Sequence, residues 1–124
     1  MVSYGHDIDA AWLIEEAAAI IKNQSLWQHV KQHCVNLVIS AKDGLETVAV
    51  CGMNTIFQTT IWLKKHRWTL AETMVGFFNA WQITGGEKFL QRSLSIWDFI
   101  QQHIRDQKNG EWFWGIKFPF NFYL

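Results

Sequence analysis

The chain has 124 residues, enough for one domain or for part of one. Its 11 Lys and Arg residues balance 11 Asp and Glu residues, so net charge gives no reason to expect binding to nucleic acid or to an anionic membrane surface. Hydrophobic residues make up 49% of the sequence, which predicts a packed core and argues against intrinsic disorder. No basic segment followed by an apolar run opens the sequence, and no apolar stretch is long enough to span a bilayer.

The aromatic and cysteine residues indicate a buried core and a reducing compartment. The sequence contains 8 Trp and 9 Phe residues. Indole rings supply buried area to a core and also stack on sugar faces, and composition favours the core for most of them. Cys34 and Cys51 stand among apolar residues without the spacing of metal ligands. We therefore predict two buried free thiols and a cytoplasmic location.

Apolar periodicity and capping residues predict five helices. Asp7 is expected to cap the first helix, and Gly44 to end the second. Thr69 and Glu72 have the spacing of a capping box, which places the start of the fourth helix at Thr69. The expected helices cover residues 8–22, 26–41, 55–65, 69–84 and 87–105. Residues 45–54 and 111–120 are expected to be extended or irregular.

This pattern predicts an all-α chain of antiparallel helical hairpins joined by short loops. The residues expected to face inward from the last two helices are Leu70, Met74, Phe77, Phe78, Trp81, Leu90, Leu94, Trp97, Ile100 and Ile104. Many of the helices carry apolar residues on more than one face, so each hairpin is expected to have a neighbour on both sides.

One pair of residues at the start of the first helix could carry acid–base chemistry. His6 and Asp9 are three residues apart and can lie on the same side of one helical turn. The imidazole could then exchange a proton near neutral pH while the carboxylate orients it. From the residues alone, the favoured interpretation is that Asp7 and Asp9 complement the helix dipole and that His6 is a surface residue.

Two other groups of residues carry weaker signals. His29 and His33 have the spacing of a metal-binding pair on a helix, but no acidic third ligand is nearby and Lys31 lies between them. No metal site is predicted there. Trp112 and Trp114 could present their rings to a sugar or could cover an edge of the core.

Three stretches in one collinear order resemble a known family. They are SYGHDIDAAWL at 3–13, KHRWTLAETMVGFFNAWQITG at 65–85 and FLQRSLSIWDFIQQHIRDQKNGEWFW at 89–114. They resemble the N-acylglucosamine 2-epimerase superfamily, and the first stretch is most similar to its cellobiose 2-epimerase branch. The resemblance runs from about Ser3 to Gly115.

The resemblance implies an (α/α)6 barrel whose inner helices surround a sugar-binding cleft. It also implies a reaction in which the sugar ring opens and a base removes the proton at C2. A cis-enediolate forms, and an acid returns the proton to the opposite face, so that two acid/base groups must flank the substrate. Neither a metal nor an organic cofactor is implied for these proton transfers.

Residue by residue, the resemblance places five positions in the cleft. His6 falls on an acid/base histidine, and Asp9 falls where the family has a glutamate beside it. Trp68 and Glu72 match the second tryptophan and the glutamate of a cleft motif, and Trp12 matches the tryptophan of the first motif.

The chain also departs from the family pattern. Arg67 replaces the first tryptophan of the cleft motif and Leu70 replaces its glutamine, while the motif with the second catalytic histidine does not occur. The resemblance therefore implies that residues 1–124 are a partial barrel domain, part of its later half and incomplete at both ends. We expect a sugar 2-epimerase that is inactive as this piece, acting on a mono- or disaccharide when completed. The alternative is a non-catalytic helical module that self-associates or pairs with the missing barrel half.

Overall fold

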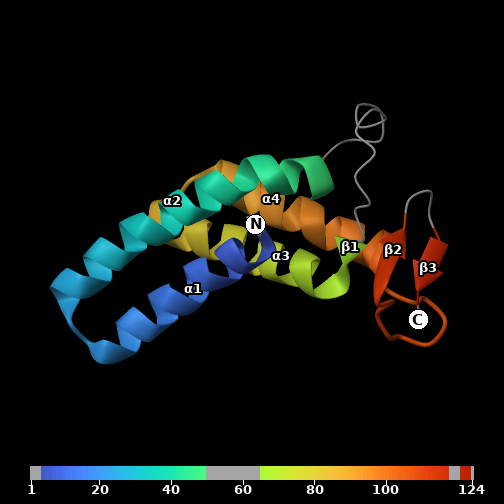
Figure 1. Ribbon diagram of the computed structural model, residues 1–124, viewed down its shortest axis with the longest axis horizontal. Helices are drawn as coiled ribbons and strands as arrows, with labels where there is room; N and C mark the ends of the chain where they lie inside the picture. Colours follow the sequence, from blue (N-terminus) through green and yellow to red (C-terminus); the bar gives the residue numbers. More distant parts are fainter. Residues whose placement is uncertain (1–3, 50–64, 118–120, 124) are drawn as a thin grey trace.

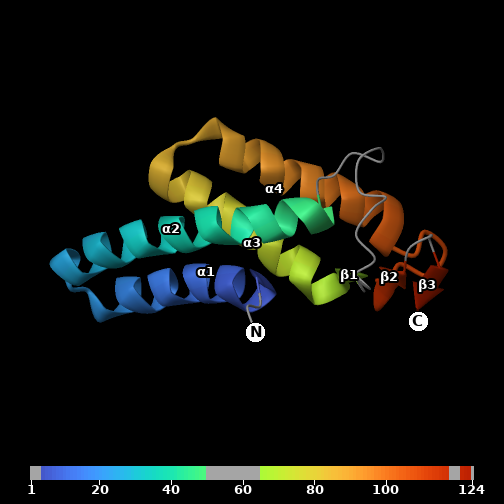
Figure 2. The ribbon, with the colours of Figure 1, turned by 45° about the horizontal axis from the view of Figure 1, so that its top comes forward.

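The computed structural model of the chain describes residues 4–49, 65–117 and 121–123, and helices dominate it (Figure 1). The helices are, in chain order, α1 (Tyr4–Ile21), α2 (Gln24–Ala49), α3 (Arg67–Thr84) and α4 (Glu87–Phe99), with α4 continuing into the one-turn π-helix η1 (Ile100–Ile104). The two hairpins α1–α2 and α3–α4 lie side by side, and α3 packs against α1, α2 and α4 (Figure 2). The predicted all-α class of antiparallel hairpins is confirmed. None of the helices that the structure describes is long and apolar enough to span a membrane.

A small antiparallel sheet adjoins the start of α3. Its strands, in sheet order, are β1 (Lys65–His66), β2 (Gly115–Lys117) and β3 (Asn121–Tyr123). The expected extended conformation of the aromatic segment is therefore observed where the structure describes it. The helix expected over 55–65 lies outside the described residues, except for Lys65, which begins β1.

Two of the helix boundaries expected in the first hairpin are wrong. α1 begins at Tyr4, so Asp7 lies in its first turn instead of capping it. α2 continues through Gly44 to Ala49, where an extended link was expected from residue 45. A glycine inside a helix costs only about 1 kcal/mol relative to alanine, and packing of the flanking turns can offset that cost.

Two other boundaries follow the local signals. The side chain of Asn23 accepts a hydrogen bond from the Leu26 amide at 3.0 Å and caps α2. At the end of α3, Gly85 has a φ of +69°, the left-handed conformation that glycine adopts without a steric penalty. Its amide donates to the Trp81 carbonyl at 2.7 Å, so the turn between α3 and α4 closes as predicted.

The predicted capping box at the start of α3 is not formed. The helix begins two residues earlier, at Arg67, because the Arg67 amide donates to the Trp114 carbonyl at 3.0 Å, beside the pairing of β1 with β2. A neighbouring backbone segment thus satisfies an amide that would otherwise need a side-chain cap. Thr69 lies inside the helix, where its carbonyl accepts a hydrogen bond from Thr73 at 2.6 Å.

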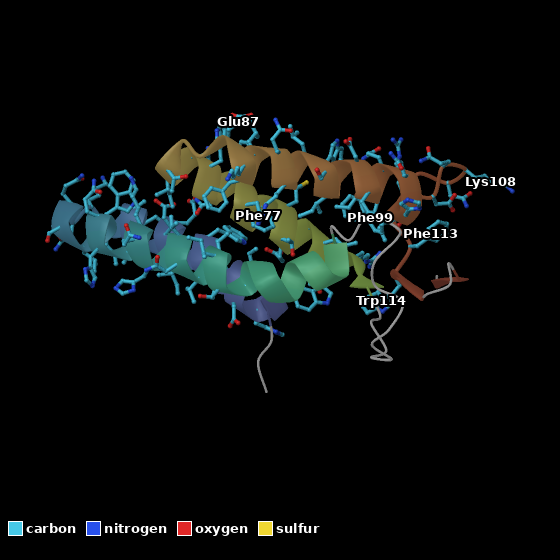
Figure 3. The ribbon with its side chains drawn as sticks, turned by 90° about the horizontal axis from the view of Figure 1, so that it is seen from above. Phe77, Glu87, Phe99, Lys108, Phe113 and Trp114 are labelled. Carbon is cyan, nitrogen blue, oxygen red and sulfur yellow. The ribbon has the colours of Figure 1, made fainter. Side chains whose placement is uncertain are left out.

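The core lies where the four helices and η1 meet, and Phe77 lies near its centre (Figure 3). Its members are Ile8, Ala11, Cys34, Val38, Ala41, Leu70, Phe77, Ala80, Ile96, Ile100 and Ile104. The ring of Phe77 stacks on that of Phe89 with 6.4 Å between centroids. Because every helix contributes, neither hairpin could bury this apolar surface alone.

The buried face of α4 differs from the one expected. Leu94 and Trp97 are exposed, and Ser93 and Ile96 face the core in their place. Serine can occupy a core position here because its hydroxyl donates to the Met74 carbonyl at 2.9 Å. Phe78, expected to point inward from α3, is also exposed.

Helices α1 and α3 point in the same general direction, cross at an angle (Figure 2) and approach each other closely. A β carbon built on Gly76 would collide with Ile8 Cγ1 and lie 3.3 Å from the Ile8 carbonyl oxygen. Near the helix starts, a β carbon on Gly5 would lie 3.1 Å from Thr69 Cγ2. The two glycines therefore allow a separation that larger residues would prevent.

We predict that Gly76→Ala destabilises the fold. The added methyl group must move Ile8 or separate α1 from α3, a change of about 1–3 kcal/mol in the free energy of unfolding. Urea denaturation measures this, and Gln82→Ala at an exposed position of α3 is the control, expected to stay within about 0.5 kcal/mol. A Gly76→Ala variant as stable as the native chain would contradict the close packing.

Candidate active site

The starts of α1 and α3 bring two of the predicted site residues into ring contact. The His6 and Trp68 rings meet edge to face, with 5.3 Å between centroids and 62° between planes. The close approach of Gly5 allows this contact, since its β carbon would lie 3.1 Å from Trp68 Cη2. His6 is exposed and Trp68 is 39% exposed, so part of each side chain is in contact with solvent.

Further along, the same two helices are joined by a hydrogen bond. Trp12 Nε1 on α1 donates to Glu72 Oε2 on α3 at 2.8 Å. Both side chains are partly buried, and the bond fixes the orientation of the carboxylate. Asp9 is half-buried and lies on α1 between His6 and Trp12. All five predicted site residues therefore come from the N-terminal halves of two adjacent helices.

Arg67 holds an aromatic segment next to this group. Its Nη1 donates to the Trp112 carbonyl at 3.1 Å, and its guanidinium lies 5.1 Å from the centroid of the Trp114 ring. Trp114, labelled in Figure 3, is 51% exposed. Sequence reasoning gave Arg67 no such role, because the contact joins residues 45 positions apart and only strand pairing brings them together.

A second indole–carboxylate pair, which the sequence did not predict, lies deeper in the structure. Glu15 on α1 is only 7% exposed. It accepts hydrogen bonds from Trp27 Nε1 of α2 at 2.6 Å and from Asn79 Nδ2 of α3 at 3.3 Å. A buried carboxylate needs such donors, and here they come from two other helices. We interpret Glu15 as a structural residue, because its carboxylate is buried whereas His6 is exposed to solvent.

The thiol of Cys34 lies near this buried carboxylate. Burial raises the pKa of Cys34 above its ordinary value, and the negative charge of Glu15 raises the pKa further. Cys34 is a free cysteine, as predicted. Cys51 lies outside the described residues. With its neutral form favoured, the Cys34 thiol is a poor nucleophile and belongs to the core.

Comparison with known sequences yields one protein family. A sequence model of the N-acylglucosamine 2-epimerase (GlcNAc 2-epimerase) family matches residues 1–117. A cellobiose 2-epimerase of Bacteroides fragilis is 34% identical over 122 residues, which is 94% of this chain and 30% of that protein. One from Dictyoglomus turgidum is 36% identical over 122 residues, covering 93% of this chain and 30% of that protein. The chain thus spans about a third of the length of these relatives.

Solved structures of sugar epimerases share the fold. The crystal structure of a sugar epimerase from a ruminal bacterium aligns with a TM-score of 0.76 and 27% identity, covering 98% of this chain and 31% of that one. A cellobiose 2-epimerase from Bacillus thermoamylovorans aligns with a TM-score of 0.67 and 26% identity, covering 94% and 30%. These relatives are (α/α)6 barrels, so the two hairpins form part of such a barrel, as predicted.

We predict that Cys34 resists alkylation in the native state and reacts rapidly in urea. Peptide mapping after iodoacetamide treatment distinguishes it from Cys51. Folding raises the pKa of the Cys34 thiol, so the contribution of this group to the free energy of unfolding is complete below its unfolded pKa. That contribution is lost as pH rises, by up to about 1.4 kcal/mol per pH unit. When pH is raised from about 8 to 10, the free energy of unfolding should therefore fall less in Cys34→Ala than in the native chain. Equal alkylation rates in the folded and unfolded states would contradict burial of the thiol.

Proposed function

The chain belongs to the N-acylglucosamine 2-epimerase family, and from this premise we propose that its helices form one wall of the active site of a sugar 2-epimerase. The observation that carries the proposal is the contact of the exposed His6 ring with Trp68. It places a group able to exchange protons near neutral pH beside an aromatic face able to hold a sugar ring. The relatives named as cellobiose 2-epimerases support a disaccharide of the cellobiose type as substrate.

In the proposed reaction His6 acts on the open-chain sugar. Its neutral imidazole takes the proton from C2, and the electron pair left behind forms the enediolate with the neighbouring aldehyde carbon. Return of a proton to the other face of C2 gives the epimer, while return to the same face regenerates the substrate. His6 serves one face, so the complete enzyme needs a second acid/base group on the other.

The neighbouring residues would position the substrate and the histidine. Trp68 would stack on the apolar face of a sugar ring, which its exposure allows. Trp12 occupies Oε2 of Glu72, so Oε1 would accept a hydrogen bond from a sugar hydroxyl. Asp9, one turn after His6, would orient the imidazole. One methylene shorter than glutamate, it would reach the ring from closer to the α1 backbone.

We predict that the 124 residues alone do not epimerise sugars, and that they do so within a complete barrel. The motif carrying the second catalytic histidine does not occur in them, and one wall gives little pre-organisation of a substrate. The test replaces the matching third of the Bacteroides fragilis cellobiose 2-epimerase with this chain and follows cellobiose by NMR. The chimera should turn over, and its His6→Gln variant should lose at least about a hundredfold in rate, the contribution of one acid–base group.

The control is His29→Gln in the same chimera, a histidine on α2 away from the site, which should leave turnover unchanged. A folded chimera whose activity survives His6→Gln would overturn the assignment of His6. Epimer formation by the isolated chain, abolished by His6→Gln, would overturn the need for a second wall.

A second function, self-association or pairing with other barrel helices, is supported by the exposed apolar surface. Along α1, Leu13 and Ile14 are about half exposed, Ile20 is 76% exposed and Ile21 is 62% exposed. Monomeric proteins seldom expose contiguous apolar patches larger than a few hundred Å². Covering such a face against another helix yields roughly 25 cal/mol per Å².

We predict that the chain does not sediment as a stable monomer at low micromolar concentration. Apolar contacts between copies should drive association, since the balanced charge provides little repulsion. The double variant Ile14→Lys/Ile21→Glu removes apolar area at unchanged net charge and should shift the distribution toward monomer. Glu16→Gln, at an exposed polar position of the same helix, is the control and should associate like the native chain. A sharp native monomer peak with cooperative unfolding would contradict this proposal.

A further inference from the structure

The first half of α2 carries two histidines whose rings converge. His29 and His33 are one helical turn apart and both exposed. Their Nε2 atoms are 3.1 Å apart, and 4.7 Å separates the ring centroids. Since α1 and α2 form an antiparallel hairpin, this part of α2 lies near the turn that joins the two helices. It is therefore far from the start of α1 and from the proposed sugar site (Figure 2).

The separation of the two nitrogen atoms matches the bite of a metal chelate. An imidazole nitrogen binds Zn²⁺ at 2.0–2.1 Å, so two nitrogens 3.1 Å apart subtend an angle of about 98° at the ion. That value lies between the angle of about 90° in octahedral coordination and about 109° in tetrahedral coordination. Without a metal, one Nε2 must carry a proton for the pair to be hydrogen-bonded. On binding, that proton would move to Nδ1 and leave both Nε2 lone pairs for the ion.

The ammonium group of Lys31, which argued against a metal site in the sequence analysis, lies on another side of α2. Lys31 is two residues from each histidine, about 200° around the helix axis. Its ammonium group lies 3.5 Å from the centroid of the Trp27 ring, which draws the charge onto the opposite side of α2. Gln32, also between the histidines in sequence, donates to Asn36 at 3.2 Å. Lys31 and Gln32 thus turn to other partners.

We propose that His29 and His33 bind one divalent transition-metal ion of the Zn²⁺ class through their Nε2 atoms. Within residues 4–49, 65–117 and 121–123, no three His, Cys, Asp or Glu side chains are grouped to hold a metal, so water completes the coordination. Imidazole ligands select zinc, copper and nickel over magnesium and calcium, which prefer oxygen. Among these ions, copper should bind more tightly than zinc.

Zinc titration calorimetry near neutral pH tests the proposal in a Cys51→Ser background, because an accessible thiolate would itself bind zinc. We expect one Zn²⁺ per chain and no binding of Mg²⁺. His29→Gln and His33→Gln should each weaken zinc binding at least about tenfold, since even outer partners of metal ligands contribute that much. His6→Gln removes an exposed histidine outside the pair and should bind zinc like the parent chain.

An NMR measurement on the parent chain keeps the test independent of how the variants fold. Zinc should shift the side-chain Nε2 resonances of His29 and His33, and not those of His6 and His103. The proposal would be overturned by no zinc binding even at millimolar concentration, or by binding that leaves the His29 and His33 resonances unchanged. Affinity unaltered in both folded single variants would overturn it equally.

Discussion

The close contact between Gly76 and Ile8 sets the distance between α1 and α3, and the proposed sugar site depends on that distance. The two helices point in the same general direction but cross at an angle (Figure 2), so this contact fixes their spacing in the region where they cross. At their starts, Gly5 meets the Trp68 ring, which brings His6 into contact with it. A larger residue at either glycine would push the helices apart, and the contact between His6 and Trp68 would be lost.

Two hydrogen bonds of the same chemical type reinforce this arrangement with different consequences. Trp12 donates to Glu72 and joins α1 to α3, while Trp27 donates to Glu15 and joins α2 to α1. Glu15 is buried, so its bonds satisfy a charge that water does not reach. Glu72 is less buried than Glu15 and lies near the partly exposed Trp68, and we propose that its fixed carboxylate faces a ligand. Exposure distinguishes the structural pair from the one we place in the site.

The relation of the chain to a barrel accounts for both the single wall that we propose and the exposed apolar surface. Epimerisation requires groups on two faces of the substrate, and we propose that His6 serves one of them. In a barrel each hairpin has two neighbours, so helices carry apolar residues beyond those facing their own partner. Phe78, Leu94 and Trp97 are exposed here although their hydrophobicity suggested burial. We propose that other barrel helices cover them, since apolar periodicity does not distinguish packing within a hairpin from packing against a neighbour.

Local chemistry in the sequence determined the hairpins and the types of residue near the site. Asn23 and Gly85 mark helix boundaries through their own side chain or backbone, and GHD-type and cleft motifs singled out His6 and Trp68 without showing that they touch.

Tertiary structure decided what depends on distant segments. The start of α3 moved forward because the Trp114 carbonyl, supplied by a strand neighbour, accepts from the first helical amide. Glu15 became a buried junction because donors on α2 and α3 converge on it, whereas spacing alone could not distinguish it from its exposed neighbour in sequence. Helix ends are encoded within a few residues, but burial and pairing are set by whichever segments the fold brings alongside.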